Sequence, residues 1–199
     1  MYAIVEDKKV IETFNHPKKL IRNDVRYSTK IYSLWSVDEK KAIGLYEVEY
    51  DDTKKKDEEW YINTNQTIAY KTTGDKVVAS YGNATAKAIN DRNAIDENGI
   101  ELDPVQVIKG LKTIKKEMIN NQCAELLAPS DWRVVKAKET ETEMDSGWKT
   151  WRASVRAKCN SMQTQIDNAS DVDDLATLFT YTTTDGVTSR PLGEFPEKE

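Results

Sequence analysis

The first part of the chain alternates apolar and polar residues with a period of two, a pattern typical of strands that bury one face. The alternation over residues 2–14 is interrupted by a charged turn, which predicts a β-hairpin. Further strand-like segments cover 45–50, 60–70 and 76–81. Residues 1–82 are therefore predicted to form a small, antiparallel, β-rich head.

Short helix and turn signals separate these strands. Pro17 predicts a single helical turn that carries Leu20 and Ile21. Ser36 and Glu39 have the spacing of a capping box, in which the hydroxyl and the carboxylate satisfy free N–H groups at a helix start. The sequence Thr-Thr-Gly-Asp at 72–75 is typical of a hairpin turn.

The second half of the chain changes to a spacing of three and four residues, which is typical of amphipathic helices. Pro104, with Asp103 as N-cap, predicts the start of a helix whose apolar stripe continues to Leu127. A second helix is predicted from Ser146 to Ile166, and a third begins near residue 170, capped by Ser170 or Asp171. We expect the first two helices to bury their stripes against each other as an antiparallel pair.

These patterns predict an α+β protein of four parts. The expected parts are a β-rich head at 1–82, a linker at 83–101 with a connector helix from Ala84 to Ile95, a helical hairpin with a third helix at 102–180, and an extended tail at 181–199. Pro191, Gly193 and Pro196 argue against a regular element in the tail. Its apolar Leu192 and Phe195 predict that it lies along a surface.

Composition narrows the classes of function. Only 38% of the residues are apolar and 32% are charged, which suits thin cores with much wetted surface. The net charge of -5 argues against a general nucleic-acid binder, which needs a basic face. No apolar run approaches the roughly 20 residues that a bilayer crossing requires. The first residues are acidic and unlike a signal peptide, so we expect synthesis in a cytoplasm.

Candidate catalytic and metal-binding groups are few. His16, the single histidine, precedes Pro17, which indicates a surface turn rather than a catalytic pair. Cys123 and Cys159 each fall in a helical pattern and are interpreted as small buried residues, because zinc would need two further ligands. The carboxylates stand at predicted caps and solvated faces. We therefore predict no catalytic residue, no metal, no cofactor and no enzymatic activity.

The tryptophans carry more information. Trp35 and Trp60 fall in the head, and Trp132, Trp148 and Trp151 fall in the helical part. They fit a thin core that relies on large aromatic side chains, and they also fit anchors of a protein–protein contact. Sugar stacking by Trp35 or Trp60 is a third interpretation.

One ordered set of residues resembles a known family. The segment Leu126-Leu127-Ala128-Pro129-Ser130-Asp131-Trp132, followed by Trp148-Lys149-Thr150-Trp151-Arg152-Ala153-Ser154-Val155-Arg156, resembles the C-terminal region of tail fibre assembly proteins, or tail assembly chaperones, of tailed bacteriophages. In that pattern a helix ends in a Ser/Thr-Asp-Trp turn, and the next helix carries an aromatic residue, an Arg and a second Arg four positions later. Trp151 stands where the pattern usually has Tyr. Weaker similarity covers 36–48 and the ending 190–196, whereas Arg133 to Met144 lacks the prolines that family members have there.

The residues suggest roles within this pattern. We expect Asp131 to cap the segment that follows it, Trp132 to close the open end of the helical hairpin, and Arg152 and Arg156 to line one face of the second helix. The resemblance implies a non-catalytic component of the virion tail or tail fibre, structural or adaptor, within an oligomeric assembly of other tail proteins, without nucleic acid or membrane. The predicted partner-binding residues are Trp132, Trp148, Trp151, Arg152, Arg156, Leu192 and Phe195.

Three alternatives remain open. The first is a tail fibre chaperone that is not retained in the particle. The second is a carbohydrate-binding module for host recognition, and the third is a cell-wall hydrolase of the tail. The sugar-binding alternative requires an exposed Trp35 or Trp60. The hydrolase requires two carboxylates that face each other in a cleft.

Overall fold

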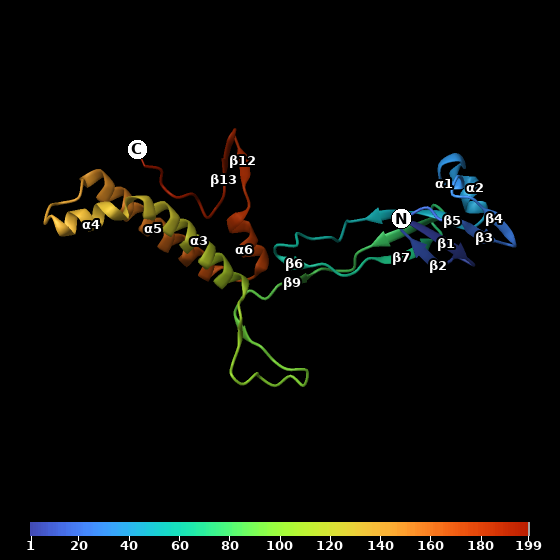
Figure 1. Cartoon of the computed structure of the whole chain (residues 1–199), viewed down its shortest axis with the longest axis horizontal. Helices are drawn as coiled ribbons and strands as arrows, with labels where there is room; N and C mark the ends of the chain where they lie inside the picture. The colour runs from blue at the N-terminus through green and yellow to red at the C-terminus, as the bar shows by residue number, and fades with distance from the viewer. Residues whose placement is uncertain (199) are drawn as a thin grey trace. The chain divides into compact units, whose positions relative to one another are not determined.

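A computed structural model describes residues 1–198, and the chain divides into two compact units, Met1–Thr85 and residues 86 onward (Figure 1). The boundary falls inside the predicted linker. The first unit is rich in strands and the second contains the long helices, so the predicted α+β class is confirmed.

The first unit is built on a five-stranded sheet with the strand order β2-β1-β5-β8-β7. Its elements are β1 (Tyr2–Glu6), β2 (Lys9–Phe14), β3 (Leu20–Arg22), β4 (Val25–Tyr27), α1 (Ile31–Leu34), α2 (Val37–Ala42), β5 (Leu45–Asp51), β6 (Tyr61–Ile62), β7 (Thr67–Lys71), β8 (Lys76–Ser80) and, at the boundary, β9 (Thr85–Ala86). The hairpin β1–β2 is the one expected from the sequence, and β7–β8 has the expected turn. The strand predicted over 60–70 is interrupted, because β6 pairs with β9 in a separate two-stranded sheet and only β7 joins the main sheet.

The sheet is mixed rather than purely antiparallel. β5 pairs with β8 in the parallel direction, with Val48 opposite Val77, whereas the other pairs in this sheet are antiparallel. Alternation predicts that a segment is a strand, but it does not determine which neighbour the strand pairs with. The direction of this pair is therefore a property of the tertiary structure.

Both faces of the central strands are buried. One cluster contains Ala3, Val5, Val48, Val77 and Ala79, and the other contains Ile4, Leu20, Ile31, Tyr32 and Leu45. Because consecutive residues of a strand point to opposite faces, β1 and β5 contribute to both clusters.

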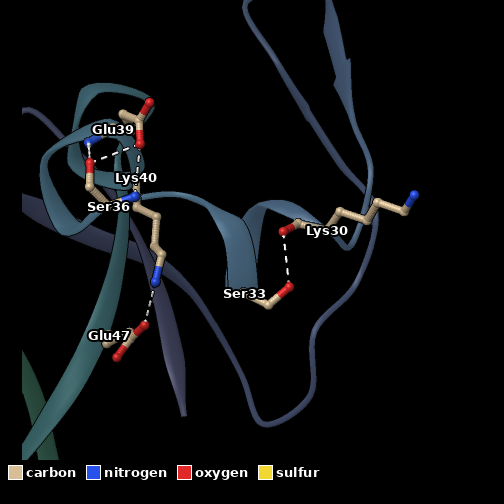
Figure 2. A network of polar contacts seen from close by, with 6 residues as sticks. All are labelled: Lys30, Ser33, Ser36, Glu39, Lys40 and Glu47. Carbon is tan, nitrogen blue, oxygen red and sulfur yellow. Dashed lines mark hydrogen bonds and ion pairs between the residues drawn. The ribbon is translucent and has the colours of Figure 1, made fainter.

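The predicted capping box at α2 is confirmed (Figure 2). The Ser36 hydroxyl accepts from the Glu39 backbone N–H at 3.2 Å, and the Glu39 carboxylate accepts from the Ser36 backbone N–H at 2.8 Å. Lys40 is buried and donates to Glu47 at 2.7 Å, which joins α2 to β5.

The helical turn expected after Pro17 is wrong, because this segment forms the hairpin β3–β4. Asn23 and Asp24 both have positive φ values, 49° and 60°, as the two central residues of a tight hairpin turn often do. The Asn-Asp pair was the sequence signal for this turn.

The second unit contains four α-helices and three short hairpin or turn elements. Its elements are β10 (Arg92–Asn93), β11 (Val107–Ile108), α3 (Leu111–Leu127), η1 (Ala128–Ser130), α4 (Asp131–Glu139), α5 (Ser146–Asn168), α6 (Val172–Phe179), β12 (Thr182–Thr184) and β13 (Val187–Ser189).

Helices α3 and α5 form the expected antiparallel pair (Figure 1). Near one end the Lys116 ammonium lies 2.7 Å from the Asp167 carboxylate, and near the other end Arg152 donates to the Leu127 carbonyl at 2.7 Å. The buried side chains of the pair are Leu111, Lys115, Ile119 and Cys123 on α3, and Arg152, Val155, Cys159, Met162 and Ile166 on α5.

The start predicted for the first of these helices, Pro104, is wrong by about two turns. Helix α3 begins at Leu111 with Gly110 as N-cap, whereas residues 92–108 form an exposed hairpin through β10 and β11. The connector helix expected from Ala84 to Ile95 is absent, because this stretch is extended. Gly110 packs so closely on the backbone of Asn90 that a Cβ would overlap it, and its N–H donates to Asp91 at 2.7 Å. These tertiary contacts determine where the helix begins.

Two further differences concern the C-terminal region. Residues 131–139, for which no helix was predicted, form α4, and residues 182–189 of the expected extended tail form the hairpin β12–β13. The cap predicted for the third helix is confirmed, because the Asp171 carboxylate accepts from the Asp174 backbone N–H at 2.9 Å.

Candidate protein-interaction surface

Arg152 ties three helical segments together at the end of the α3–α5 pair. Its side chain is 6% exposed, and it donates to the Leu127 carbonyl, to the Ser130 hydroxyl and, at 2.6 Å, to the Asp131 carboxylate. The Ser130 hydroxyl in turn donates to the Leu127 carbonyl at 2.8 Å. The buried guanidinium therefore satisfies backbone and side-chain acceptors where α3 ends and α4 begins.

The role expected for Asp131 is wrong. Its carboxylate does not cap α4, which begins without a side-chain cap; it forms an ion pair with Arg152 instead. The cap was predicted from the spacing of neighbouring residues. The true partner of Asp131 lies 21 positions away in the sequence, so local spacing does not reveal it. The Ser-Asp and Arg of the sequence pattern are thus parts of one hydrogen-bonded unit.

Next to Arg152, three tryptophan rings and the Arg133 guanidinium form a row across α4 and α5. The Arg133 guanidinium lies 4.6 Å from the ring centre of Trp132 and 4.5 Å from that of Trp148. Trp148 meets Trp151 edge to face at 5.6 Å. Each cation–ring contact contributes about 0.5–1 kcal/mol at an exposed site. These contacts therefore hold the tryptophan and arginine side chains in place although they are not fully buried.

Helix α4 carries the exposed part of this surface. None of its nine residues is buried, and Trp132 and Val135 are each 54% exposed. These two residues are three positions apart and lie on one side of the helix. Trp132 therefore does not close the hairpin as expected; it stands in solvent at the edge of the aromatic row.

The C-terminal tail lies along the helices of its own unit. Leu192 is fully buried, its N–H donates to the Leu178 carbonyl at 3.1 Å, and its carbonyl accepts from Lys158 at 2.8 Å. The Trp151 indole N–H donates to the Pro196 carbonyl at 3.0 Å. The prediction that the tail follows a surface is confirmed for residues 190–196, which lie on α5 and α6, whereas residues 181–189 are exposed.

The predicted partner-binding residues therefore divide into two groups. Trp132, Trp148 and Trp151 come together in the aromatic row, with Trp132 the most exposed. Arg152 and Leu192 are buried in the protein's own packing, which removes them from a partner surface. Arg156 is exposed one turn from Arg152, and Phe195 is half-buried in the tail.

Sequence reasoning missed Arg133, Val134 and Val135. All three fall between the two long predicted helices, where no helix was predicted, so their positions on one helix were not considered. The signal was the Trp-Arg-Val-Val run itself, which is apolar enough to need either burial or a partner.

The head tryptophans do not form an open platform. Trp60 is buried, and Trp35 is half-buried with its ring against Tyr27 at 5.5 Å. Trp60 is therefore not accessible for stacking on a sugar, and the ring of Trp35 is only partly accessible.

Acidic side chains line an open hollow of about 730 Å³ in the head, but their partners are local. Glu49 pairs with Lys76 at 2.7 Å. Hydrogen bonds from the Thr53 hydroxyl and then its backbone N–H lower the pKa of Asp51. A glycosidase needs an acid whose pKa is raised, and lowered values are typical of turn and cap carboxylates.

The two cysteines are buried and free, as expected. Burial, followed by a hydrogen bond with Cys159, raises the pKa of the Cys123 thiol, so the two thiols lie together between α3 and α5. Within residues 1–198, no cluster of three or more His, Cys, Asp or Glu side chains has the arrangement of a metal site. Over the same residues, no helix has the length and apolar character needed to cross a membrane.

Comparison with family models, with curated proteins and with solved structures found no match to this chain. The resemblance to phage tail assembly proteins therefore stays a prediction that rests on the residues quoted above.

Proposed function

We propose that the chain is a non-catalytic component of a bacteriophage tail or tail fibre that binds another tail protein through α4. The single observation that carries this proposal is a helix of nine residues with no buried side chain, which presents Trp132 and Val135 together. Trp is enriched among the residues that contribute most to protein–protein binding.

The surroundings of Trp132 support binding of a protein rather than a small molecule. The cavity beside it, between α4 and the start of α5, measures about 160 Å³, below the ~300 Å³ at which ligand pockets begin. The Arg133 guanidinium restrains the ring, so less side-chain freedom is lost when a partner covers it. A ring of this kind, with Val135 beside it, suits an apolar side chain of a partner.

The assignment to a phage tail rests on the sequence resemblance, and the assignment of the binding surface rests on the exposure of α4. The Ser130-Asp131 and Arg152 unit fixes the start of α4 to α5, which gives the exposed helix a rigid base. A preorganised surface binds with a smaller entropic cost than a flexible one.

The first experiment asks whether purified phage particles contain the chain. We expect it at a fixed ratio to a tail or fibre protein. Presence in infected cells together with absence from particles would favour the chaperone alternative, and absence of any tail-protein complex in both would contradict the proposal.

The second experiment tests the surface. Trp132→Ala should weaken capture of the tail partner by at least about tenfold, because tryptophan anchors contribute about 2 kcal/mol or more. Val135→Ala should weaken capture by less, because valine is under-represented among such anchors. Val187→Ala is a matched control, since Val187 is also exposed but lies in the β12–β13 hairpin. Equal losses from Val187→Ala and Trp132→Ala would contradict a specific role for α4.

A further inference from the structure

Two short hairpins, one in each unit, are separate from the five-stranded sheet and from the α3–α5 pair, and each has exposed apolar side chains. They are named here the basic hairpin, residues 18–30 around β3–β4, and the acidic arm, residues 92–108 around β10–β11. Each is a separate two-stranded sheet, so its outer edges carry unpaired backbone groups. Open edges are templates for pairing with another strand, and an isolated two-stranded hairpin is only marginally stable in water.

The acidic arm combines negative charge with uncovered apolar side chains. From residue 93 to residue 108 it has four acidic residues and no Lys or Arg. Its exposed apolar side chains are Ile95, Ile100, Val105, Val107 and Ile108. Figure 1 shows the arm extending away from the start of α3, as a long excursion between β10 and β11. Each of these side chains is between 43% and 66% exposed.

The tip of the arm has a defined shape. The Asp96 carboxylate accepts from the Asn98 and Ile100 backbone N–H groups at 2.8 and 2.9 Å. Gly99 completes the turn with a φ of 81°. Glu97, Glu101 and Asp103 form no ion pair within the described chain, so their charges are available.

The basic hairpin has the opposite charge. Residues 18–30 contain five basic residues and one acidic residue. Lys19, Arg26 and Lys30 have no acidic partner among residues 1–198, and Figure 2 shows Lys30 extended away from the other labelled side chains. Arg26 lies directly opposite Ile21 across the two strands, and Ile21 is 66% exposed.

The inner face of this hairpin is anchored, which leaves the outer face as a fixed surface. Leu20 is buried in the core of the first unit, and Tyr27 packs edge to face on Trp35. The Arg22 guanidinium binds Glu6 at 2.5 Å, which adds a second attachment. Ile21 and Arg26 therefore remain on the side that the unit does not use.

We propose that the acidic arm of one copy of this chain binds the basic hairpin of a second copy, strand edge to strand edge. Such pairing extends two two-stranded sheets into one, brings Glu97, Glu101 and Asp103 toward Lys19, Arg26 and Lys30, and covers Ile21 with isoleucines of the arm. Because every copy carries one arm and one hairpin, the contact is heterologous and repeats from copy to copy. It uses neither Trp132 nor α4 and is independent of the function proposed above.

Charge reversal tests this pairing. One variant combines Lys19→Glu, Arg26→Glu and Lys30→Glu, and the other combines Glu97→Lys, Glu101→Lys and Asp103→Lys. In sedimentation velocity at low salt, we expect the wild type to self-associate as concentration rises and to dissociate when salt is added. Each variant alone should associate at least about tenfold more weakly, because like charges then face each other. An equimolar mixture of the two variants should associate again, since each reversed surface meets its complement.

The control combines Lys8→Glu, Lys54→Glu and Lys71→Glu, three exposed lysines of the first unit outside the basic hairpin. It changes the net charge equally and should associate like the wild type. Circular dichroism of every variant checks that the fold is retained. A wild type that stays monomeric at all concentrations, or two folded variants whose mixture does not associate, would overturn the proposal. A monomer that expands on charge reversal without any concentration dependence would overturn it too, by showing that the arm binds its own chain.

Discussion

Helices α5 and α4 belong to the same unit and follow one another in the fold, yet they are covered very differently. Five side chains of α5 are buried, including Val155, Met162 and Ile166, whereas α4 buries none. Both helices carry apolar residues, so the difference in burial comes from the elements that pack against each helix. Helix α5 has α3 along one face and the tail along another, while α4 projects beyond the end of α3. The uncovered apolar side chains of a helix are those that a partner can use.

The largest expected effect tests the covered side of this comparison. Ile119 and Ile114 are both isoleucines of α3, but Ile119 is 0% exposed and Ile114 is 47% exposed. Ile119→Ala should lower the free energy of unfolding by about 2–5 kcal/mol, because it leaves a cavity between α3 and α5. Ile114→Ala should cost well under that, and chemical denaturation monitored by circular dichroism measures both. Equal costs would show that α3 and α5 do not bury their stripes against each other.

A smaller effect is expected where the covered and uncovered helices join. Arg152→Met should cost about 1–3 kcal/mol, because the Leu127 carbonyl and the Ser130 hydroxyl lose a buried partner. Arg156→Met is the matched control, since Arg156 is exposed one turn later on the same helix, and it should change stability by less than about 0.5 kcal/mol. Thermal unfolding distinguishes the two. If Arg156→Met were as damaging as Arg152→Met, the buried unit at the α3–α4 junction would not be the source of the effect.

The smallest expected effect tests the uncovered helix. Val135→Ala on α4 should change the free energy of unfolding by no more than about 0.5 kcal/mol, since the side chain is 54% exposed and has little packing to lose. Val155→Ala on α5 removes the same atoms from a fully buried position and should cost several times more. Denaturant titration of both variants makes the comparison. A loss from Val135→Ala comparable to that from Val155→Ala would mean that α4 is packed and not available to a partner.

Local chemistry was predictable where a signal and its structure are close in sequence. The predictions of the capping box of Ser36 and Glu39 and of the cap at Asp171 are confirmed, because each side chain satisfies an N–H group three residues away. The α3–α5 pairing was also predictable, since two long stripes of helical spacing need a shared core. The Asn-Asp turn of β3–β4 was equally local but was read as a helical turn after Pro17.

The candidate surface was only partly predictable. The tryptophans were recognised as a group, but Arg152 was expected on a surface and is buried, and Asp131 was expected as a cap and is its ion-pair partner. Exposure depends on what packs against a side chain from elsewhere in the chain. Residue type and spacing do not contain that information.

The sequence by itself determined the α+β class, the change from strand to helix period along the chain, the capped starts of α2 and α6, the hairpin at 2–14 and the turn at 72–75 that joins β7 to β8. The parallel pairing of β5 with β8, the start of α3 at Leu111, the burial of Leu192 and the exposure of α4 were decided by the tertiary structure. The physical reason is the range of the interactions. Periodicity and caps act over a few residues. The parallel strand pair, the start of α3 and the burial of Leu192 each depend on a contact between segments that are distant in sequence. The exposure of α4 depends on the lack of such a contact among the described residues.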